Sequence, residues 1–351
     1  MTGITTATGE NLVVEWLHDI DEQPHIPGPE ANWSENWLTY GWDQQLGIGV
    51  YFHIGRHPGP LGIHETTFNV YLPGDRFLTH RGFATIEPGG SPTVGAVTFH
   101  CEKPFQQWRK RFRGAAHATT GNELRAGPLR DGSYVDVDLD LTISAASPPF
   151  DFGSQKLDQS WGSGHYEQHH RFTATLCIGT EHVELHGTGL RDHSWGPRDW
   201  SGVGDTTWYH GHFPSGRSFM VVSVPGRPPF EPFVYGVVSD HGTVRRVEVA
   251  EVPPVTAVYH RDGSYSTDSP YELSLRTADG PRTIQCEIVQ SMPMTFIPPT
   301  QIGIGTHRGP YASHENVETI TKFTLDGETG YGLVTACRDL AGPHADSASA
   351  P

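Results

Sequence analysis

The chain has 351 residues, of which 36% are hydrophobic and 11% aromatic, and its 41 glycines and 28 prolines favour short strands and turns over long helices. Its formal net charge of −16 disfavours nucleic acids and anionic membrane surfaces as partners. No apolar run approaches the roughly 18 residues of a membrane helix, and the first residues lack the basic and apolar pattern of a secretory signal. We therefore expect a cytoplasmic protein with no stable membrane insertion.

The first half of the chain reads as a lead-in followed by strands. Residues 1–30 are polar and contain several prolines, which predicts an irregular segment. In residues 134–144 apolar positions alternate with polar ones that include three aspartates, the pattern of a strand with one packed and one wet face. The basic segment 103–114 is compatible with a short helix, but we favour a solvated strand face. Further strands are predicted over residues 45–56, 66–72 and 94–101.

A connection rich in serine, proline and glycine over residues 145–164 precedes a second series of strands. Asp326-Gly327 predicts a hairpin turn, and residues 341–351 predict a disordered tail. Regular strands without helical periodicity predict an all-β protein with two antiparallel barrels or sandwiches, the first within residues 1–150 and the second within residues 165–340. The strands of the second half are predicted over residues 170–178, 182–187, 205–213, 217–224, 233–239, 243–250, 256–260, 271–277, 283–289, 318–325 and 331–337.

The densest group of charged and aromatic residues is the segment 187–200, with the sequence G-T-G-L-R-D-H-S-W-G-P-R-D-W. If the preceding strand continues through it, Asp192 points to one face and Arg191 and His193 point to the other. Two tryptophans are unusual in a surface loop because they are large and mostly apolar, and Arg-Asp-His in a row is unusual in a core strand because buried charge must be paired. Together they favour the polar end of an apolar cavity. A buried ion-pair corner is the equal alternative, with Arg191 or Arg198 pairing with Asp192 or Asp199.

Three further groups of residues carry candidate chemistry. His210-Gly211-His212 has the spacing of two metal ligands on one strand face, but no third ligand stands at a recognisable distance. We therefore expect no metal, and we expect these histidines to bind carboxylates or to line a pocket mouth. The polar runs at residues 165–170 and 33–43 fit either a site or a strand-end hydrogen-bond network. Four isolated cysteines and the absence of nucleotide-binding glycine motifs predict no cofactor.

The motif G-x-G-x-R-D-H-S-W-G-x-R-D-W, preceded by H-Y-E-Q and by N-W-S-E-N-W with D-Q-Q-L-G-I-G in the first half, resembles the lipocalin-like superfamily of carotenoid 1,2-hydratases (hydroxyneurosporene synthases), most closely a bacterial branch. The resemblance covers most of the chain. It implies two lipocalin-like antiparallel β-barrels packed together, with a hydrophobic ligand pocket and no metal, an architecture shared with some natural-product Diels–Alderases. The functional His-x-Trp pair of the hydratases corresponds to His193 and Trp195. Their acidic residue further along has no counterpart in the strand 219–224.

From these features we predict a metal-independent and cofactor-independent lyase or isomerase acting on a terpenoid or similar apolar alkene. Protonation of a C=C bond would create a carbocation that gains water, loses a proton or cyclises. The candidate catalytic residues are Asp192, His193, Trp195, Asp199 and Glu167. The candidate substrate-binding residues are Trp37, Tyr40, Trp200, Trp208, Tyr209, His210 and His212.

Two other functions remain open on the sequence. A lipocalin-type carrier would need the aromatic residues but no acid. A pericyclase that works by shape alone would turn over its substrate without any carboxylate. Substrate length, reaction direction and the existence of a homodimer are likewise left open.

Overall fold

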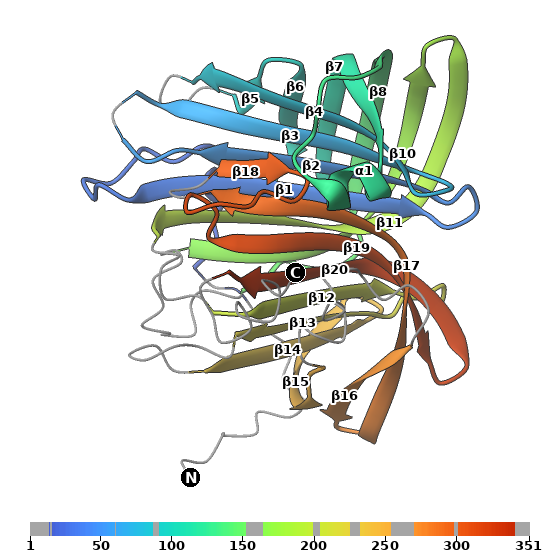
Figure 1. The fold of residues 1–351 in the computed structure, drawn as a ribbon. Coiled ribbons are helices and arrows are strands. Elements are labelled where there is room, and N and C mark those ends of the chain that lie inside the picture. The colour runs from blue at the N-terminus through green and yellow to red at the C-terminus, as the bar shows by residue number, and fades with distance from the viewer. Residues whose placement is uncertain are drawn as a thin grey trace.

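Alternating apolar residues build two antiparallel sheets in the computed structural model (Figure 1), which describes residues 14, 16–59, 61–86, 91–151, 164–198, 204–224, 232–253, 270–297 and 301–340. Within these residues, the two sheets are stacked on one another and the helical segments are short. No described helix has the length and hydropathy needed to cross a membrane. The predicted strand at 256–260 and the predicted tail at 341–351 lie outside the described residues.

The first sheet closes into a barrel because its first and last long strands also pair with each other. Along the sheet the order is β4-β3-β2-β1-β11-β10-β8-β7, and the pairing of β4 with β7 completes the ring. The small strands β5, β6 and β9 extend it at the edges. The bounds are β1 (Trp33–Asp43), β2 (Ile48–Arg56), β3 (Ile63–Leu72), β4 (Arg76–Thr85), β5 (Thr93–Val94), β6 (Val97–Lys103), β7 (Gln107–Thr120), β8 (Tyr134–Ala145), β9 (Phe150–Asp151), β10 (Gly164–Ile178) and β11 (Glu181–Pro197).

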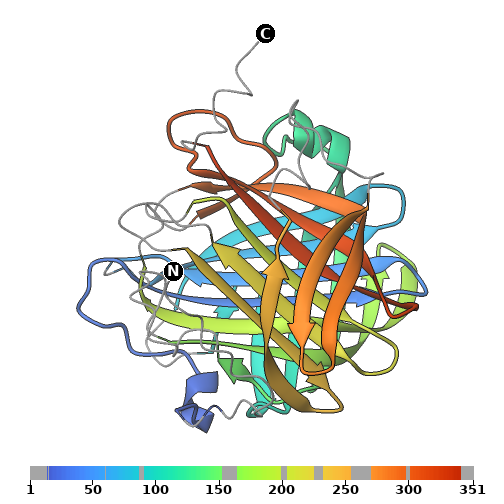
Figure 2. The same ribbon diagram turned by 90° about the horizontal axis from the view of Figure 1, so that it is seen from below.

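The second sheet closes in the same way, with the order β16-β15-β14-β13-β12-β20-β19-β17 and a pairing of β16 with β17. Figure 2 shows these olive to orange strands crossing in front of the blue and green strands of the first barrel. The predicted all-β fold of two lipocalin-like barrels is therefore confirmed. The bounds are β12 (Thr206–His212), β13 (Ser218–Val224), β14 (Phe233–Asp240), β15 (Thr243–Glu251), β16 (Tyr271–Thr277), β17 (Gly280–Ile297), β18 (Gln301–Ile304), β19 (His314–Leu325) and β20 (Glu328–Asp339), with η1 (Asp19–Glu22) and α1 (Gly121–Ala126) as the helical segments.

The boundary between the barrels differs from the predicted one. Strands β10 and β11 belong to the predicted second domain, residues 165–340, but they pair with β8 and β1 of the first barrel. The change of sheet comes between Pro197 and Thr206. The first barrel needs β10 and β11 to close its ring. The segment 145–164, which is rich in serine, proline and glycine, is therefore a connection within the first barrel and not the boundary between the two barrels.

Local patterns predicted from the sequence are confirmed where strand alternation governs them. Strand β8 buries most of its apolar positions, and two aspartates on its other face pair with arginines of β7, Asp140 with Arg109 at 2.5 Å and Asp138 with Arg113 at 3.5 Å. The basic segment is therefore a solvated strand face, although Lys110 points inward. The Asp326-Gly327 turn joins β19 to β20 with φ values of 52° and 81°, as a two-residue hairpin requires.

Three buried apolar clusters correspond to the two barrel interiors and to the contact between the barrels. The interior of the first barrel contains Phe52, Phe68 and Phe112, and that of the second contains Phe219 and Phe323. The third cluster combines residues of both barrels and is lined by strands β1 and β11 on one side and β12 and β20 on the other. We call this contact region the seam.

Candidate functional site

Strand β11 carries the motif of residues 187–200 and divides it between two environments. The strand runs through the motif, so Arg191, His193 and Trp195 face the interior of the first barrel, whereas Asp192 and Ser194 face the seam. This is the alternation expected from the sequence. Its consequence is that the polar groups of the motif belong to two separate sites.

Inside the first barrel, the guanidinium group of Arg191 forms a buried ion pair with Glu22 of the lead-in. Arg191 Nη2 lies 2.6 Å from Glu22 Oε1, and the side chains are 4% and 0% exposed. Arg191 also donates to Gln168 Oε1 at 2.6 and 3.0 Å. The ion-pair interpretation therefore applies to Arg191, but its partner is Glu22 and not Asp192. The other proposed partner, Asp199, lies outside the described residues.

His193 lies at the mouth of the same barrel and contacts Glu35. Its Nε2 is 2.9 Å from Glu35 Oε1, and its Nδ1 is 2.9 Å from the main-chain oxygen of Asp21. The imidazole stacks on Trp37, with ring centroids 4.7 Å apart. His193 and Trp37 are thus part of the first barrel, and the side chain of His193 does not reach Asp192, its expected partner, because the two point to opposite faces of β11.

Trp195 covers a second imidazole at this mouth. Its ring stacks on His25 with centroids 4.0 Å apart and planes inclined by 19°. On β10 the opposing residue is Gly164, where a Cβ atom would lie 2.4 Å from the indole, so the ring occupies space that only glycine leaves free. The ligand atoms of His25, Glu35 and His193 lie within 4.8 Å of one another, a spacing that a metal ion can bridge.

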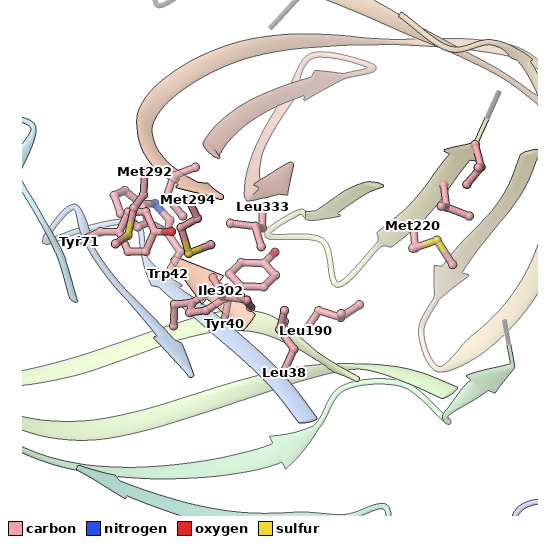
Figure 3. Close-up of a cluster of buried hydrophobic side chains, with 14 of the residues drawn as sticks. Leu38, Tyr40, Trp42, Tyr71, Leu190, Met220, Met292, Met294, Ile302 and Leu333 are labelled. Atoms are coloured by element: carbon pink, nitrogen blue, oxygen red, sulfur yellow. The ribbon is translucent and has the colours of Figure 1, made fainter. Parts of the chain in front are cut away.

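Asp192 and Glu167 face the seam from adjacent strands of the first barrel. Asp192 Oδ1 accepts the main-chain N–H of Leu38 at 2.9 Å, and Oδ2 lies 3.2 Å from His165 Nε2. Apolar and aromatic side chains surround these acids. Figure 3 shows part of this lining, with Tyr40 pointing toward Leu333 of the second barrel.

The carboxyl group of Glu167 is fully buried and poorly solvated by the protein. The side chain is 0% exposed, and neither oxygen has a hydrogen-bond partner of ordinary geometry among the described residues. Burial, reinforced by the nearby charge of Asp192, holds the pKa of Glu167 well above its usual value, and the indole of Trp208 offsets only part of this rise. The environment therefore favours the neutral acid, the form that can donate a proton.

Strand β12 brings Trp208, His210 and His212 to the opposite side of the seam. The rings of Trp208 and His210 meet edge to face with centroids 4.2 Å apart. Burial, together with the nearby His212, holds the pKa of His210 well below its usual value, and neither nitrogen of His210 has a hydrogen-bond partner among the described residues. Of the two roles expected for these histidines, bonding to carboxylates or lining a pocket mouth, His212 does not show the first at Nε2, which donates to the main-chain oxygen of Gly189 at 2.7 Å.

Glu318, a second buried acid near the seam, is not among the site residues predicted from the sequence. Its carboxyl accepts hydrogen bonds from Asn316 at 3.0 Å and from Thr335 at 2.5 Å. Burial raises the pKa of Glu318 to about 7, and the charge of Asp192 contributes to this rise. An acid inside the otherwise apolar and threonine-rich stretch 317–321 is a sequence signal that could have identified it.

The remaining predicted substrate-binding residues are placed as follows. Tyr40 lies in the seam with its ring 6.2 Å from that of His210. Tyr209 does not line the seam, because strand alternation turns it away from its neighbours and into the second barrel, where it packs near Tyr271. Trp200 lies outside the described residues.

Two eight-stranded lipocalin-like barrels, joined at a seam of buried acids, imidazoles and aromatic rings, define the structural class of this protein. The chain belongs to the family described as a domain of unknown function (DUF7064), whose model matches residues 18–339. No relative is found among curated protein sequences.

Solved structures with the same fold extend over nearly the whole chain. An AttH-like protein from Nitrosomonas europaea has a TM-score of 0.58 at 14% identity, covering 87% of this chain and 92% of that chain. Kievitone hydratase from Nectria haematococca has a TM-score of 0.56 at 11% identity, and the match covers 94% of this chain and 96% of the hydratase chain. CghA has a TM-score of 0.52 at 13% identity, and the match covers 94% of this chain and 97% of the CghA chain. The predicted resemblance to the lipocalin-like hydratase superfamily is thus confirmed at the level of the fold.

Proposed function

We propose that the protein is a cofactor-independent lyase or isomerase that protonates a C=C bond of a terpenoid or similar apolar alkene bound in the seam. The observation that carries the proposal is a pair of neutral buried groups on facing walls. Burial raises the pKa of Glu167 of the first barrel well above its usual value and lowers the pKa of His210 of the second barrel well below its usual value, which favours the neutral form of each group. Groups whose pKa values are shifted in opposite directions are suited to act as general acid and general base.

Glu167 is the proposed proton donor. Transfer of its proton to one alkene carbon would use the π electrons to form the new C–H bond and leave a cation on the other carbon. The ionised Glu167 would then face that cation across an apolar environment, where opposite charges attract more strongly than in water. Burial with no hydrogen bond of ordinary geometry from the described residues disfavours the carboxylate, so Glu167 keeps the proton that the reaction would use.

The aromatic rings of the seam are the proposed stabilisers of the cation. Trp208 neighbours both the acid and the base, since its indole is close to Glu167 and its ring centroid is 4.2 Å from that of His210. An indole face is the strongest cation–π partner among side chains. Tyr40 and the apolar residues around it would hold the hydrocarbon skeleton without competing for the charge.

His210 is the proposed base. Its free ring nitrogens could take a proton from a water molecule that attacks the cation, which gives hydration. They could equally take a proton from the adjacent carbon, which gives isomerisation or cyclisation with a new double bond. His165 connects the acids, with Nε2 3.2 Å from Asp192 and 3.7 Å from Glu167, so it is placed to return a proton to Glu167.

The structural neighbours support this class of reaction at the level of the fold. One is named as a hydratase, kievitone hydratase, and another structure of CghA contains Sch210972. Identities of 11% and 13% transfer the architecture and not the substrate. The terpenoid character of the substrate therefore rests on the apolar lining of the seam and on the sequence resemblance.

Incubation with a panel of acyclic terpenoids in D₂O, followed by mass spectrometry, tests the proposal. Protonation of the alkene by a group that exchanges with solvent places deuterium on carbon, even when no net product accumulates. We expect deuterium incorporation by the parent protein and a loss of about 100-fold or more in Glu167→Gln. Glu184→Gln, which changes an exposed glutamate on β11, is the matched control and should retain the parent rate.

Two results would contradict the proposal. A ligand that binds tightly and is recovered without deuterium would identify a carrier. Product formation that is unaffected by Glu167→Gln, Asp192→Asn and Glu318→Gln would identify catalysis by shape alone.

A further inference from the structure

The mouth of the first barrel holds two histidines on one glutamate oxygen. Glu35 Oε1 lies 2.7 Å from His25 Nδ1 and 2.9 Å from His193 Nε2. The main-chain N–H of His25 also donates to both Glu35 oxygens at 3.1 Å. These groups come from the lead-in, from β1 and from β11, so three segments distant in sequence meet at one carboxylate.

The outward nitrogens of both imidazoles have oxygen acceptors. His193 Nδ1 lies 2.9 Å from the main-chain oxygen of Asp21, and since a carbonyl only accepts, Nδ1 carries the hydrogen. His25 Nε2 lies 3.3 Å from Asp21 Oδ1. In neutral His193 this arrangement turns the lone pair of Nε2 toward Glu35, and in neutral His25 the tautomer with its hydrogen on Nε2 turns the lone pair of Nδ1 toward the same carboxylate. Carbonyl and carboxylate acceptors behind the ring are the usual second layer around metal-bound histidines.

The charges and walls of the cluster fit one divalent cation. Two lone pairs directed at a carboxylate repel it unless protons or a cation lie between them. The carboxylates of Glu35 and Asp21 together offer two negative charges, which one divalent ion balances while both imidazoles stay neutral. The faces of the imidazoles are covered by Trp195 and Trp37, which fix their orientation.

We propose that His25, Glu35 and His193 bind a divalent transition-metal ion that fastens the lead-in, residues 16–25, to the mouth of the first barrel. Two imidazoles and one carboxylate suit zinc and its first-row neighbours, and three protein ligands leave a position for water or a small ligand. No metal is expected from the sequence, because only His210 and His212 stand at a ligand spacing there and because the family resemblance implies none. This site lies inside the first barrel, across the sheet from the seam, and does not depend on the proposed alkene chemistry.

Metal titration of protein purified without a histidine tag and dialysed against chelator tests the site. We expect one Zn²⁺ per chain by calorimetry, and visible absorption bands of imidazole-bound Co²⁺ when cobalt replaces zinc. We also expect the melting temperature to rise with added metal, because an ion bound only to the folded state stabilises it. His25→Ala should weaken binding by at least about 100-fold.

A protein with many histidines needs a control for adventitious binding. His57→Ala is matched to His25→Ala, because His57 Nε2 lies 3.1 Å from Glu65 Oε2 and no second imidazole of the described residues bonds to that carboxylate. It should bind metal like the parent protein. Binding that is absent from the parent, or that is equal in the parent and in His25→Ala, would overturn the proposal. Should His25→Ala alter the fold, Glu35→Gln must abolish the Co²⁺ bands in a protein of unchanged circular dichroism.

Discussion

Asp192 and His193 are consecutive in the sequence and lie on opposite sides of one sheet. Asp192 accepts a hydrogen bond from the main chain of Leu38 at the seam, whereas His193 contacts Glu35 inside the first barrel. A motif that reads as one site is therefore two, with acid–base chemistry proposed on one face and metal binding on the other. Substitutions at these two positions should have separable effects.

The pH dependence of alkene protonation should depend on the charge of Asp192, because this charge helps to raise the pKa of Glu167. Turnover requires neutral Glu167, so it is lost as pH rises through the elevated pKa of this acid. It also requires neutral His210, whose lowered pKa delays the acid-side loss to pH values well below 6.5. In Asp192→Asn, one cause of the raised pKa of Glu167 is absent, so we expect the basic limb to move to lower pH and the acidic limb to stay.

Rate profiles of the parent and Asp192→Asn over the full pH range measure this shift. Other titratable groups near Glu167, such as His165 and Tyr235, are left in place by the substitution. An unmoved basic limb would mean that another group sets it.

Glu318 should make the folded protein less stable at alkaline pH. Burial raises its pKa from 4.5 to about 7, so the folded state keeps a proton that the unfolded state loses. The stability contributed by this group is thus complete below pH 4.5 and declines as pH rises through 7, by about 3 kcal/mol in total. Glu318→Gln should remove this decline.

Urea unfolding at about pH 5 and pH 8 compares the two proteins. Glu272→Gln, which removes a carboxylate from the exposed face of β16, controls for the loss of one negative charge. An equal decline in the parent and in Glu318→Gln would contradict the assignment of a raised pKa to Glu318.

The ion pair between Glu22 and Arg191 should stabilise the lead-in strongly. Both side chains are buried, so Glu22→Gln leaves the guanidinium charge of Arg191 without compensation. We expect the free energy of unfolding to fall by about 3 kcal/mol or more. The same substitution in a half-exposed pair, Glu328→Gln beside Arg217, should cost less than about 1 kcal/mol. Similar losses in the two variants, measured in urea, would argue against a buried pair.

Alkene turnover should survive removal of metal. The proposed donor and base face the seam, while His25, Glu35 and His193 lie on the other side of the β1–β11 sheet. Chelator dialysis should therefore lower the melting temperature without changing deuterium incorporation at moderate temperature. Loss of turnover on chelation, with recovery on adding Zn²⁺, would place the metal in the catalytic mechanism.

The sequence by itself determined the fold class and the alternation within each strand. Apolar positions of period two in β8 and the Asp326-Gly327 turn are local patterns, because side-chain alternation and turn conformation depend on neighbouring residues only. The same locality explains why the two faces of Asp192 and His193 were predicted correctly. It also explains the inclusion of Glu167, which stands in a conspicuously polar run.

Only the tertiary structure decided which strands close each barrel and which distant groups meet. β10 and β11 pair with strands far away in the sequence, so no local composition assigned them to the first barrel. Glu22 and His25 of the lead-in contact Arg191 and Glu35, and the pairing depends on the barrel mouth over which the lead-in folds. Glu167 and His210 likewise come to face the same seam only because the two barrels pack together. Burial shifts the pKa values of both groups, and burial is a property of the folded protein and not of either strand.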